Sequence, residues 1–285
     1  MAPIGGFSRA SLPIREPLPL LEASAIRDSP LVKDRFLSGR NISTFLPGQW
    51  LDVYTPISPN AGGFTITSHP YLLEPAQPSP YLELAIQSSP TNPPAAYLWQ
   101  DPSSILHTPI HIRVGGSFTF PPGHLTSWNH IKRMVFIAGG VGINPLISML
   151  SQIAHTQETT SDSDFFSVSF LYTTRARPLR ETLFLSRLTE AVTSLKDQAT
   201  ATLFRTQPKA SSELEAKSEE SRSSLAIQER RITAEDILNE LGPVEDRSNV
   251  VVYVCGPPQL TDEFVEVAKK AEGMKEENVL CEKWW

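Results

Sequence analysis

The sequence is poor in cysteine, and this excludes several kinds of site. Only Cys255 and Cys281 occur among its 285 residues. Two cysteines are too few for a four-cysteine iron–sulfur cluster or a structural zinc site, and they form no disulfide framework. We therefore expect no metal site and a reducing compartment.

Long apolar runs and an excess of positive charge are also missing. No stretch approaches the ~18 consecutive apolar residues of a membrane span. A net charge of −6 leaves no basic field for nucleic acid or anionic lipid. Small molecules are therefore the expected partners. The first fifteen residues contain no acid and no apolar signal core, so cytoplasmic and mitochondrial locations both stay open.

Two kinds of pattern divide the chain. Proline is dense over residues 56–122, where short apolar runs bounded by Gly, Pro, Asn and Ser predict an antiparallel β-barrel. The predicted strands there are Trp50–Tyr54, Gly63–Thr67, Tyr81–Ile86 and Ile110–Val114. After Lys132, strands alternate with helices, which predicts a parallel sheet in an α/β domain. The strands expected there are Met134–Ala138, Val168–Tyr172, Ala201–Phe204 and Val250–Val254. Two helices are expected at Glu181–Ser194 and Thr233–Leu241, and two more are expected to begin after residue 143 and after residue 258.

These patterns predict two domains with two segments outside their cores. Residues 1–16 are expected to be disordered, 17–128 to form the barrel and 129–285 to form the α/β domain. Residues 208–230, rich in Ser and Glu, are predicted to be a flexible insertion because they bury too little apolar surface to offset the entropy of ordering.

The strongest motif is a glycine-rich turn between a predicted strand and an amphipathic helix. It consists of Gly139, Gly140, Val141, Gly142, Ile143, Asn144 and Pro145. Glycine lets the backbone approach a ligand closely, and the following helix offers N–H groups to a phosphate. Pro145 departs from the Gly-x-Gly-x-x-Gly pattern but suits the first turn of a helix. A tight turn without a ligand is the alternative interpretation.

A second turn follows the predicted strand Val250–Val254. It reads Cys255, Gly256, Pro257 and Pro258 and precedes another amphipathic helix. Two such turns at the carboxyl edge of one parallel sheet would converge on the crevice where these folds bind ligands. Cys255 is more often a small buried residue than a nucleophile, since no His–Asp arrangement accompanies it.

The chain ends in two tryptophans, Trp284 and Trp285, which expose a large apolar area unless something covers them. Packing on the domain core and stacking on a planar cofactor ring both remain open.

The two turns and the terminal Glu-x-aromatic, in this order and spacing, resemble the ferredoxin–NADP reductase superfamily. The resemblance covers roughly Pro17 to Trp285. It implies an N-terminal antiparallel barrel that holds FAD and a C-terminal domain that holds NAD(P)H, in agreement with the division above.

The resemblance assigns a flavin site to the barrel. The segment Gly63–Ser68 stands in place of the family's Arg-x-Tyr-Ser-x-x-Ser motif, which implies flavin contacts by Phe64, Thr65, Ile66, Thr67 and Ser68. Gly62 replaces the arginine that neutralises the FAD diphosphate, and Phe64 lacks the usual tyrosine hydroxyl. Loss of one charge-assisted contact would weaken flavin binding roughly ten- to a hundredfold. Ser103 and Ser104, at an expected helix start, could offer N–H and hydroxyl groups to the diphosphate instead.

The resemblance also assigns roles around the nicotinamide. Hydride passes from the nicotinamide to the flavin, and the protein contributes positioning and exclusion of water. Gly140–Pro145 would position the dinucleotide, with Cys255 and Gly256 near the nicotinamide. Trp284 would cover the flavin, and Glu282 would orient the carboxamide or relay a proton. Thr173 and Arg175, after the predicted strand Val168–Tyr172, are further dinucleotide-binding candidates.

Two arginines bear on the choice between NADH and NADPH. Arg205 follows the predicted strand Ala201–Phe204, and Arg231 follows the insertion. They resemble the Ser-Arg…Gly-Arg-Ile pattern of NADPH-using reductases, with Phe204 for Ser and Arg230 for Gly. A cation there would accept the 2′-phosphate. This predicts a slight preference for NADPH, with two solvated surface arginines as the alternative.

These expectations combine into a flavin-dependent NAD(P)H oxidoreductase. Without a cysteine cluster, the chain must pass its electrons to an unidentified acceptor, either another protein or a diffusible molecule. The competing hypothesis is a non-catalytic dinucleotide sensor or scaffold that has lost FAD, which Gly62 and Phe64 permit.

Overall fold

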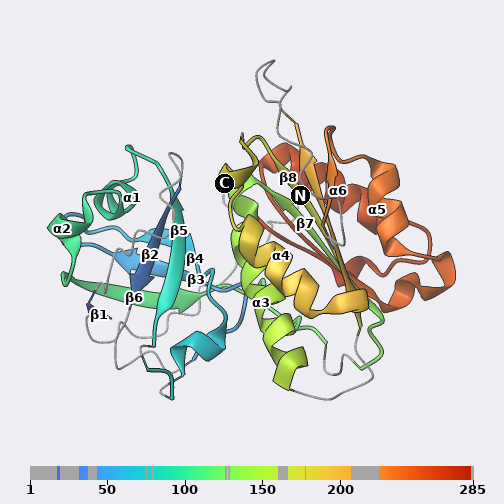
Figure 1. Cartoon of the computed structure of the whole chain (residues 1–285), viewed down its shortest axis with the longest axis horizontal. Coiled ribbons are helices and arrows are strands. Elements are labelled where there is room, and N and C mark those ends of the chain that lie inside the picture. The colour runs from blue at the N-terminus through green and yellow to red at the C-terminus, as the bar shows by residue number, and fades with distance from the viewer. Residues whose placement is uncertain are drawn as a thin grey trace, which may run out of the picture. The chain divides into compact units, whose positions relative to one another are not determined.

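The structure is a computed structural model that describes residues 18–19, 32–37, 44–74, 76–78, 80–125, 127, 129–159, 166–176, 178–206 and 225–283, the first two segments by their backbone alone. Two compact units divide the chain after Ser117 (Figure 1). Residues 1–16, which we expected to be disordered, and residues 208–224 of the expected insertion lie outside the described residues.

The first unit is built from antiparallel strands. They are β1 (Leu18–Pro19), β2 (Val32–Leu37), β3 (Trp50–Tyr54), β4 (Gly62–Thr65), β5 (Leu82–Gln87) and β6 (Pro109–Gly115). Four of them form a sheet in the order β1-β6-β3-β4, β2 pairs with β5, and a bridge between Ile66 and Leu84 links the two groups. Two short helices, α1 (Pro93–Leu98) and α2 (Pro102–Ile105), precede β6.

Apolar side chains from three strands and α1 form the core of this unit. Leu51 and Leu84 are fully buried in it. Between the buried neighbours Leu51 and Val53, Asp52 pairs in register with Arg113 of β6, and the two side chains form an ion pair. A buried carboxylate is stable only with such a partner, so this pair ties β3 to β6.

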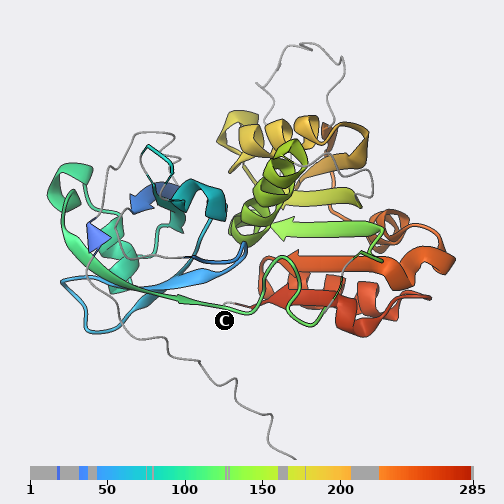
Figure 2. The same cartoon turned by 90° about the horizontal axis from the view of Figure 1, so that it is seen from below.

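The second unit holds a six-stranded parallel sheet in the order β10-β9-β8-β7-β11-β12. The strands are β7 (Arg133–Gly139), β8 (Ser167–Thr174), β9 (Ala199–Arg205), β10 (Leu225–Gln228), β11 (Val250–Cys255) and β12 (Val279–Glu282). The helices are α3 (Ile143–Thr159), α4 (Leu185–Ser194), α5 (Ala234–Leu241) and α6 (Pro258–Lys270). Figure 2 shows α3 and α4 on one face of the sheet and α5 and α6 on the other.

Burial on both faces explains the composition of the central strands. Every residue of β11 is buried, as is every residue of β7 after Arg133. Val135 and Val252 pack toward Ile237 of α5 and Phe264 of α6 in one apolar cluster. The predicted architecture, an antiparallel unit followed by a parallel α/β unit, is therefore confirmed.

The division between the units comes earlier than the boundary expected at residues 128 and 129. Phe118 lies edge-on to Tyr253 of β11 at 5.3 Å between ring centroids. The Tyr253 hydroxyl donates a hydrogen bond of 2.8 Å to the carbonyl oxygen of Thr119. The segment after Ser117 therefore packs with the second unit.

The expected insertion also contains regular structure. Leu225–Gln228 forms β10, which pairs with Ala201–Phe204 of β9. The prediction of flexibility was therefore wrong for these four residues, because three of them are apolar and pairing with β9 orders them within an otherwise polar segment.

Nowhere in the described residues is there a helix both long and apolar enough to cross a membrane.

Candidate functional site

The two predicted turns meet at the carboxyl edge of the parallel sheet. A Cβ atom added to Gly142 would lie 2.2 Å from the carbonyl oxygen of Cys255 and 2.6 Å from the backbone nitrogen of Gly256. One added to Gly139 would lie 2.8 Å from Cδ of Pro257. The turns are thus in backbone contact, and glycine is required at both positions because no side chain has room.

The first turn also presents an open surface. Gly140 has a φ of +55°, a left-handed conformation that favours glycine, and an added Cβ there would have nothing within 4 Å. Val141 is 38% exposed, whereas Gly142 and the start of α3 at Ile143, Asn144 and Pro145 are buried. A ligand can therefore approach the backbone of Gly140 and Val141 while the rest of the turn is anchored.

Two further dinucleotide candidates lie beside this turn at the end of β8. Thr173 is aligned with Gly139 of β7 on one side and Phe204 of β9 on the other, and its side chain is half-buried. Arg175 follows it and is exposed. The register of the sheet therefore brings these residues to the same edge as the glycine-rich turn.

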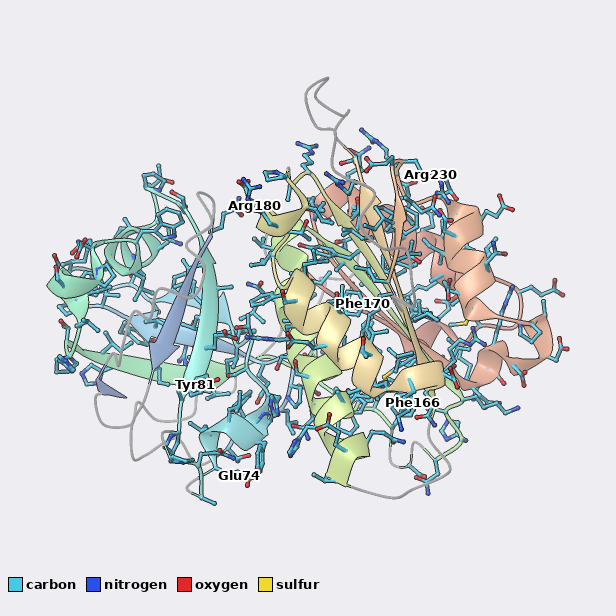
Figure 3. The ribbon with its side chains drawn as sticks, viewed as in Figure 1. Glu74, Tyr81, Phe166, Phe170, Arg180 and Arg230 are labelled. Carbon is cyan, nitrogen blue, oxygen red and sulfur yellow. The ribbon has the colours of Figure 1, made fainter. Side chains whose placement is uncertain are left out.

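More cations gather at this edge of the sheet. Figure 3 shows Arg180, in the segment after β8, and Arg230, after β10, at one end of the sheet, with Phe166 at the other. Arg180 and Arg175 are both exposed. This end therefore offers positive charge to an anionic ligand such as a diphosphate.

Glu282 lies beside Cys255. The two residues are aligned partners at the ends of β12 and β11. Cys255 is buried, and one carboxyl oxygen of Glu282, Oε2, is buried with no hydrogen-bond partner among the described residues. Burial raises the pKa of Glu282 from 4.5 to about 8. This carboxyl group therefore holds a proton at neutral pH. Trp284 lies outside the described residues.

The arginines expected at a 2′-phosphate differ in their surroundings. Arg205 is only 4% exposed, and its Nη1 lies 3.1 Å from Oε1 of Glu229. The alternative of a solvated surface arginine is therefore wrong for Arg205, because its side chain is buried at the sheet edge. Arg231 is exposed, and its guanidinium makes no polar contact with any other described residue.

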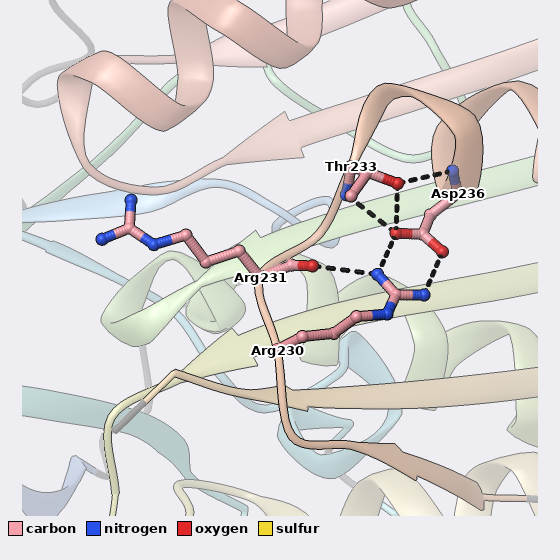
Figure 4. Close-up of polar contacts among 4 residues, drawn as sticks. All are labelled: Arg230, Arg231, Thr233 and Asp236. Carbon is pink, nitrogen blue, oxygen red and sulfur yellow. Dashed lines mark hydrogen bonds and ion pairs between the residues drawn. The ribbon is translucent and has the colours of Figure 1, made fainter. Parts of the chain in front are cut away.

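Arg230 is held by Asp236 of α5. Its guanidinium donates two hydrogen bonds to that carboxylate, at 2.6 and 2.7 Å, and a third of 2.9 Å to the carbonyl oxygen of Arg231. Asp236 also accepts hydrogen bonds from the N–H and hydroxyl of Thr233, which caps α5. These hydrogen bonds hold the pKa of Asp236 well below its usual value, and the bond from Arg230 has the largest effect. In Figure 4 the side chain of Arg231 extends away from this cluster.

The hydroxyl groups expected to bind flavin are used inside the first unit. Thr67 Oγ1 donates to Oε2 of Glu83 at 2.8 Å, and the backbone N–H of Glu83 donates to Ser68 Oγ at 3.0 Å. All three residues are buried, as are Thr65 and Ile66. The segment that replaces the flavin motif therefore anchors a buried carboxylate of β5.

The two positions expected at the FAD diphosphate also give no support for the family's mode of binding. A Cβ on Gly62 would lie 2.7 Å from the ring of Phe64 and 2.8 Å from Pro94, so no side chain fits there. At α2, Asp101 accepts hydrogen bonds from the backbone N–H and the hydroxyl of Ser103, and the N–H of Ser104 donates to the carbonyl of Asp101.

Cations for a diphosphate are also scarce in residues 44–117. The only Lys or Arg there is Arg113, which pairs with Asp52. The side chains described in this part of the first unit therefore do not fit an FAD diphosphate held in the way the family holds it.

Comparison with known proteins places the chain in a family. A family model described as "Oxidoreductase NAD-binding domain" matches residues 136–266. The human protein named oxidoreductase NAD-binding domain-containing protein 1 is 31% identical over 268 residues, which cover 92% of this chain and 78% of that protein. The chain belongs to the family of oxidoreductase NAD-binding domain-containing protein 1.

Solved structures show the same fold. A ferredoxin NADP+ reductase from Neisseria gonorrhoeae with bound FAD and NADP matches with a TM-score of 0.62 and 14% identity, over 94% of this chain and 96% of that one. A flavohemoglobin from Malassezia yamatoensis with bound FAD and heme has a TM-score of 0.67 and 18% identity, over 96% of this chain and 61% of that one. The fold expected from the resemblance to the ferredoxin–NADP reductase superfamily is confirmed.

Two acidic residues that our sequence analysis did not single out belong to the candidate site. Glu229 lies in the expected insertion, and Asp236 lies in the first turn of a predicted helix. The apolar run Leu225–Ile227 was the signal for a strand that would bring Glu229 beside Arg205. The spacing of Thr233 and Asp236 was the signal for a capping box.

Proposed function

We propose that the second unit binds a nicotinamide dinucleotide at the carboxyl edge of its sheet and that the chain acts as an NAD(P)H oxidoreductase. The backbone contact between the turns at Gly142 and Cys255 is the observation that carries this proposal. Such a pair of turns leaves an open approach to backbone groups in the crevice where parallel α/β sheets bind ligands. Membership of an oxidoreductase family and the fold of the FAD- and NADP-bound neighbour support it.

In this proposal the residues of the chain position the dinucleotide and hold a proton. Gly140 and Val141 take the diphosphate against the start of α3, with Thr173, Arg175, Pro257 and Pro258 lining the approach. Glu282, protonated at neutral pH beside Cys255, holds a proton near the place proposed for the nicotinamide. Electrons leave for an acceptor outside the chain.

Binding of the dinucleotide at this edge is tested with a pair of exposed valines. Val141 lies in the glycine-rich turn, and Val244 lies before β11 at the amino edge of the sheet, with exposed fractions of 38% and 40%. We expect Val141→Asp to weaken NADH binding at least about tenfold, because a carboxylate there repels the diphosphate. Val244→Asp adds the same charge and should leave the affinity unchanged. Isothermal titration calorimetry measures both, and equal affinities for the two variants would contradict the proposed position.

A flavin-dependent reaction requires FAD to bind as well. A second candidate function is a dinucleotide sensor or scaffold without flavin. It is favoured because the hydroxyls of Thr67 and Ser103 donate hydrogen bonds to carboxylates of the protein and because Phe64 and Pro94 fill the space beside Gly62. Titration of the full chain with FAD, followed by flavin fluorescence, separates the two. Saturable binding of FAD would support the flavin-dependent oxidoreductase. Absence of FAD binding would support the dinucleotide sensor or scaffold.

A further inference from the structure

The carboxyl edge of the sheet carries an acid, Glu229, beside Arg205, one of the two arginines expected at a 2′-phosphate. Glu229 follows β10 directly, one residue beyond the aligned pair Gln228 and Phe204, and its Oε1 lies 3.1 Å from Nη1 of Arg205 in the neighbouring strand β9. The side chain of Glu229 is 36% exposed, whereas the side chain of Arg205 is only 4% exposed. The acid therefore faces solvent at this edge, and the cation lies behind it.

The segment that carries Glu229 is held in a defined conformation. Arg230 bonds to Asp236 of α5, and its guanidinium lies 5.1 Å from the centre of the Phe204 ring. These contacts tie the residue after Glu229 both to a helix start and to the neighbouring strand. Glu229 is thus presented beside Arg205 by a fixed turn.

We propose that Glu229 is a specificity-determining residue that makes the site prefer NADH to NADPH, an inference that rests on dinucleotide binding at this edge. A carboxylate accepts a hydrogen bond from the ribose 2′-hydroxyl of NADH and repels a 2′-phosphate. Because Glu229 also neutralises Arg205, that arginine has no net charge to offer a phosphate unless the ion pair breaks.

One cation at this edge opposes the effect of Glu229. Arg231 is exposed, and its side chain extends away from the Arg230–Asp236 cluster (Figure 4). It supplies a residual attraction for a 2′-phosphate, so the preference for NADH is a ratio of affinities and does not exclude NADPH.

The test is the replacement Glu229→Gln, which keeps the size of the side chain and a hydrogen-bond acceptor for Arg205 but removes the charge. We expect wild-type protein to bind NADH more tightly than NADPH. The variant should gain at least about tenfold in NADPH affinity, while its NADH affinity changes only a few-fold. Isothermal titration calorimetry with each dinucleotide on the full chain measures the ratio, and a melting curve confirms that the variant is folded.

Glu245→Gln is the matched control, since it removes one exposed carboxylate before β11 at the opposite edge of the sheet. It should leave the affinity ratio unchanged. If both dinucleotides bind wild-type protein but Glu229→Gln leaves their ratio unchanged, or if wild-type protein already prefers NADPH, the inference is overturned and the proposed function stands. If wild-type protein binds neither dinucleotide, the proposed function fails and the inference fails with it.

Discussion

Glu282 should make the stability of this protein fall with rising pH in a range where most carboxylates no longer titrate. Its pKa is raised from 4.5 to about 8 because the carboxyl group is buried at the end of β12. In the unfolded chain the same group ionises near 4.5. Because its pKa is higher in the folded state than in the unfolded state, the Glu282 carboxyl group contributes to the free energy of unfolding fully below pH 4.5, and this contribution is lost as the pH rises through 8.

The size of this loss follows from the shift. One pKa unit corresponds to about 1.4 kcal/mol, so the free energy of unfolding should fall by about 1.4 kcal/mol per pH unit between pH 5 and pH 7.5. Above pH 8 the loss should level off. Glu282→Gln places a neutral side chain of the same size at this position and removes the dependence.

Urea denaturation of the native protein and the variant at whole pH units from 5 to 9 measures the difference between their unfolding free energies. That difference should grow steadily in favour of the glutamine variant and then become constant. Glu277→Gln, an exposed position in the turn before β12, is the control and should follow the native profile. Parallel profiles for native protein and Glu282→Gln would refute the assignment of a raised pKa to this carboxyl group.

Two further predictions concern the turns and helix starts at the same edge of the sheet. Gly142→Ala should destabilise the protein by about 3 kcal/mol or more, because its Cβ would lie 2.2 Å from the backbone of Cys255, whereas Gly140→Ala has open space and should cost only the ~1–2 kcal/mol of a left-handed conformation. Chemical denaturation compares the two, and equal losses would argue against backbone contact between the turns. Asp236→Asn should lower the melting temperature most at pH 7, and the difference should shrink progressively as the pH falls from 4 to 2, because a carboxylate with a depressed pKa contributes stability that is full above its unfolded pKa and is lost only as the pH falls through the folded pKa. A difference of the same size at pH 2 as at pH 7 would show that charge is not the cause.

Much of the fold could be predicted because the signals are local. A buried strand is indicated by the apolar run Val250–Val254. Turns are indicated by the glycines at 139, 140 and 142 and by the prolines after Gly256. The order of these elements then predicts a parallel sheet, since alternating strands and helices close in few other ways. Strand β10 was missed because its short apolar run, Leu225–Ile227, ends a segment rich in Ser and Glu, and it is pairing with β9 that orders it.

The amino-acid sequence by itself determined the two-unit architecture and the glycine-rich turn, because hydrophobic periodicity and backbone conformation are properties of neighbouring residues. Only the tertiary structure decided what Arg205, Thr67 and Ser103 do. Each of these residues is a plausible ligand contact in the sequence, yet each is bonded to a carboxylate of its own unit, at Glu229, Glu83 and Asp101 respectively. Whether a polar side chain faces a ligand or an internal partner depends on which residues the folded chain places within hydrogen-bonding distance, and those partners are not encoded in local sequence pattern.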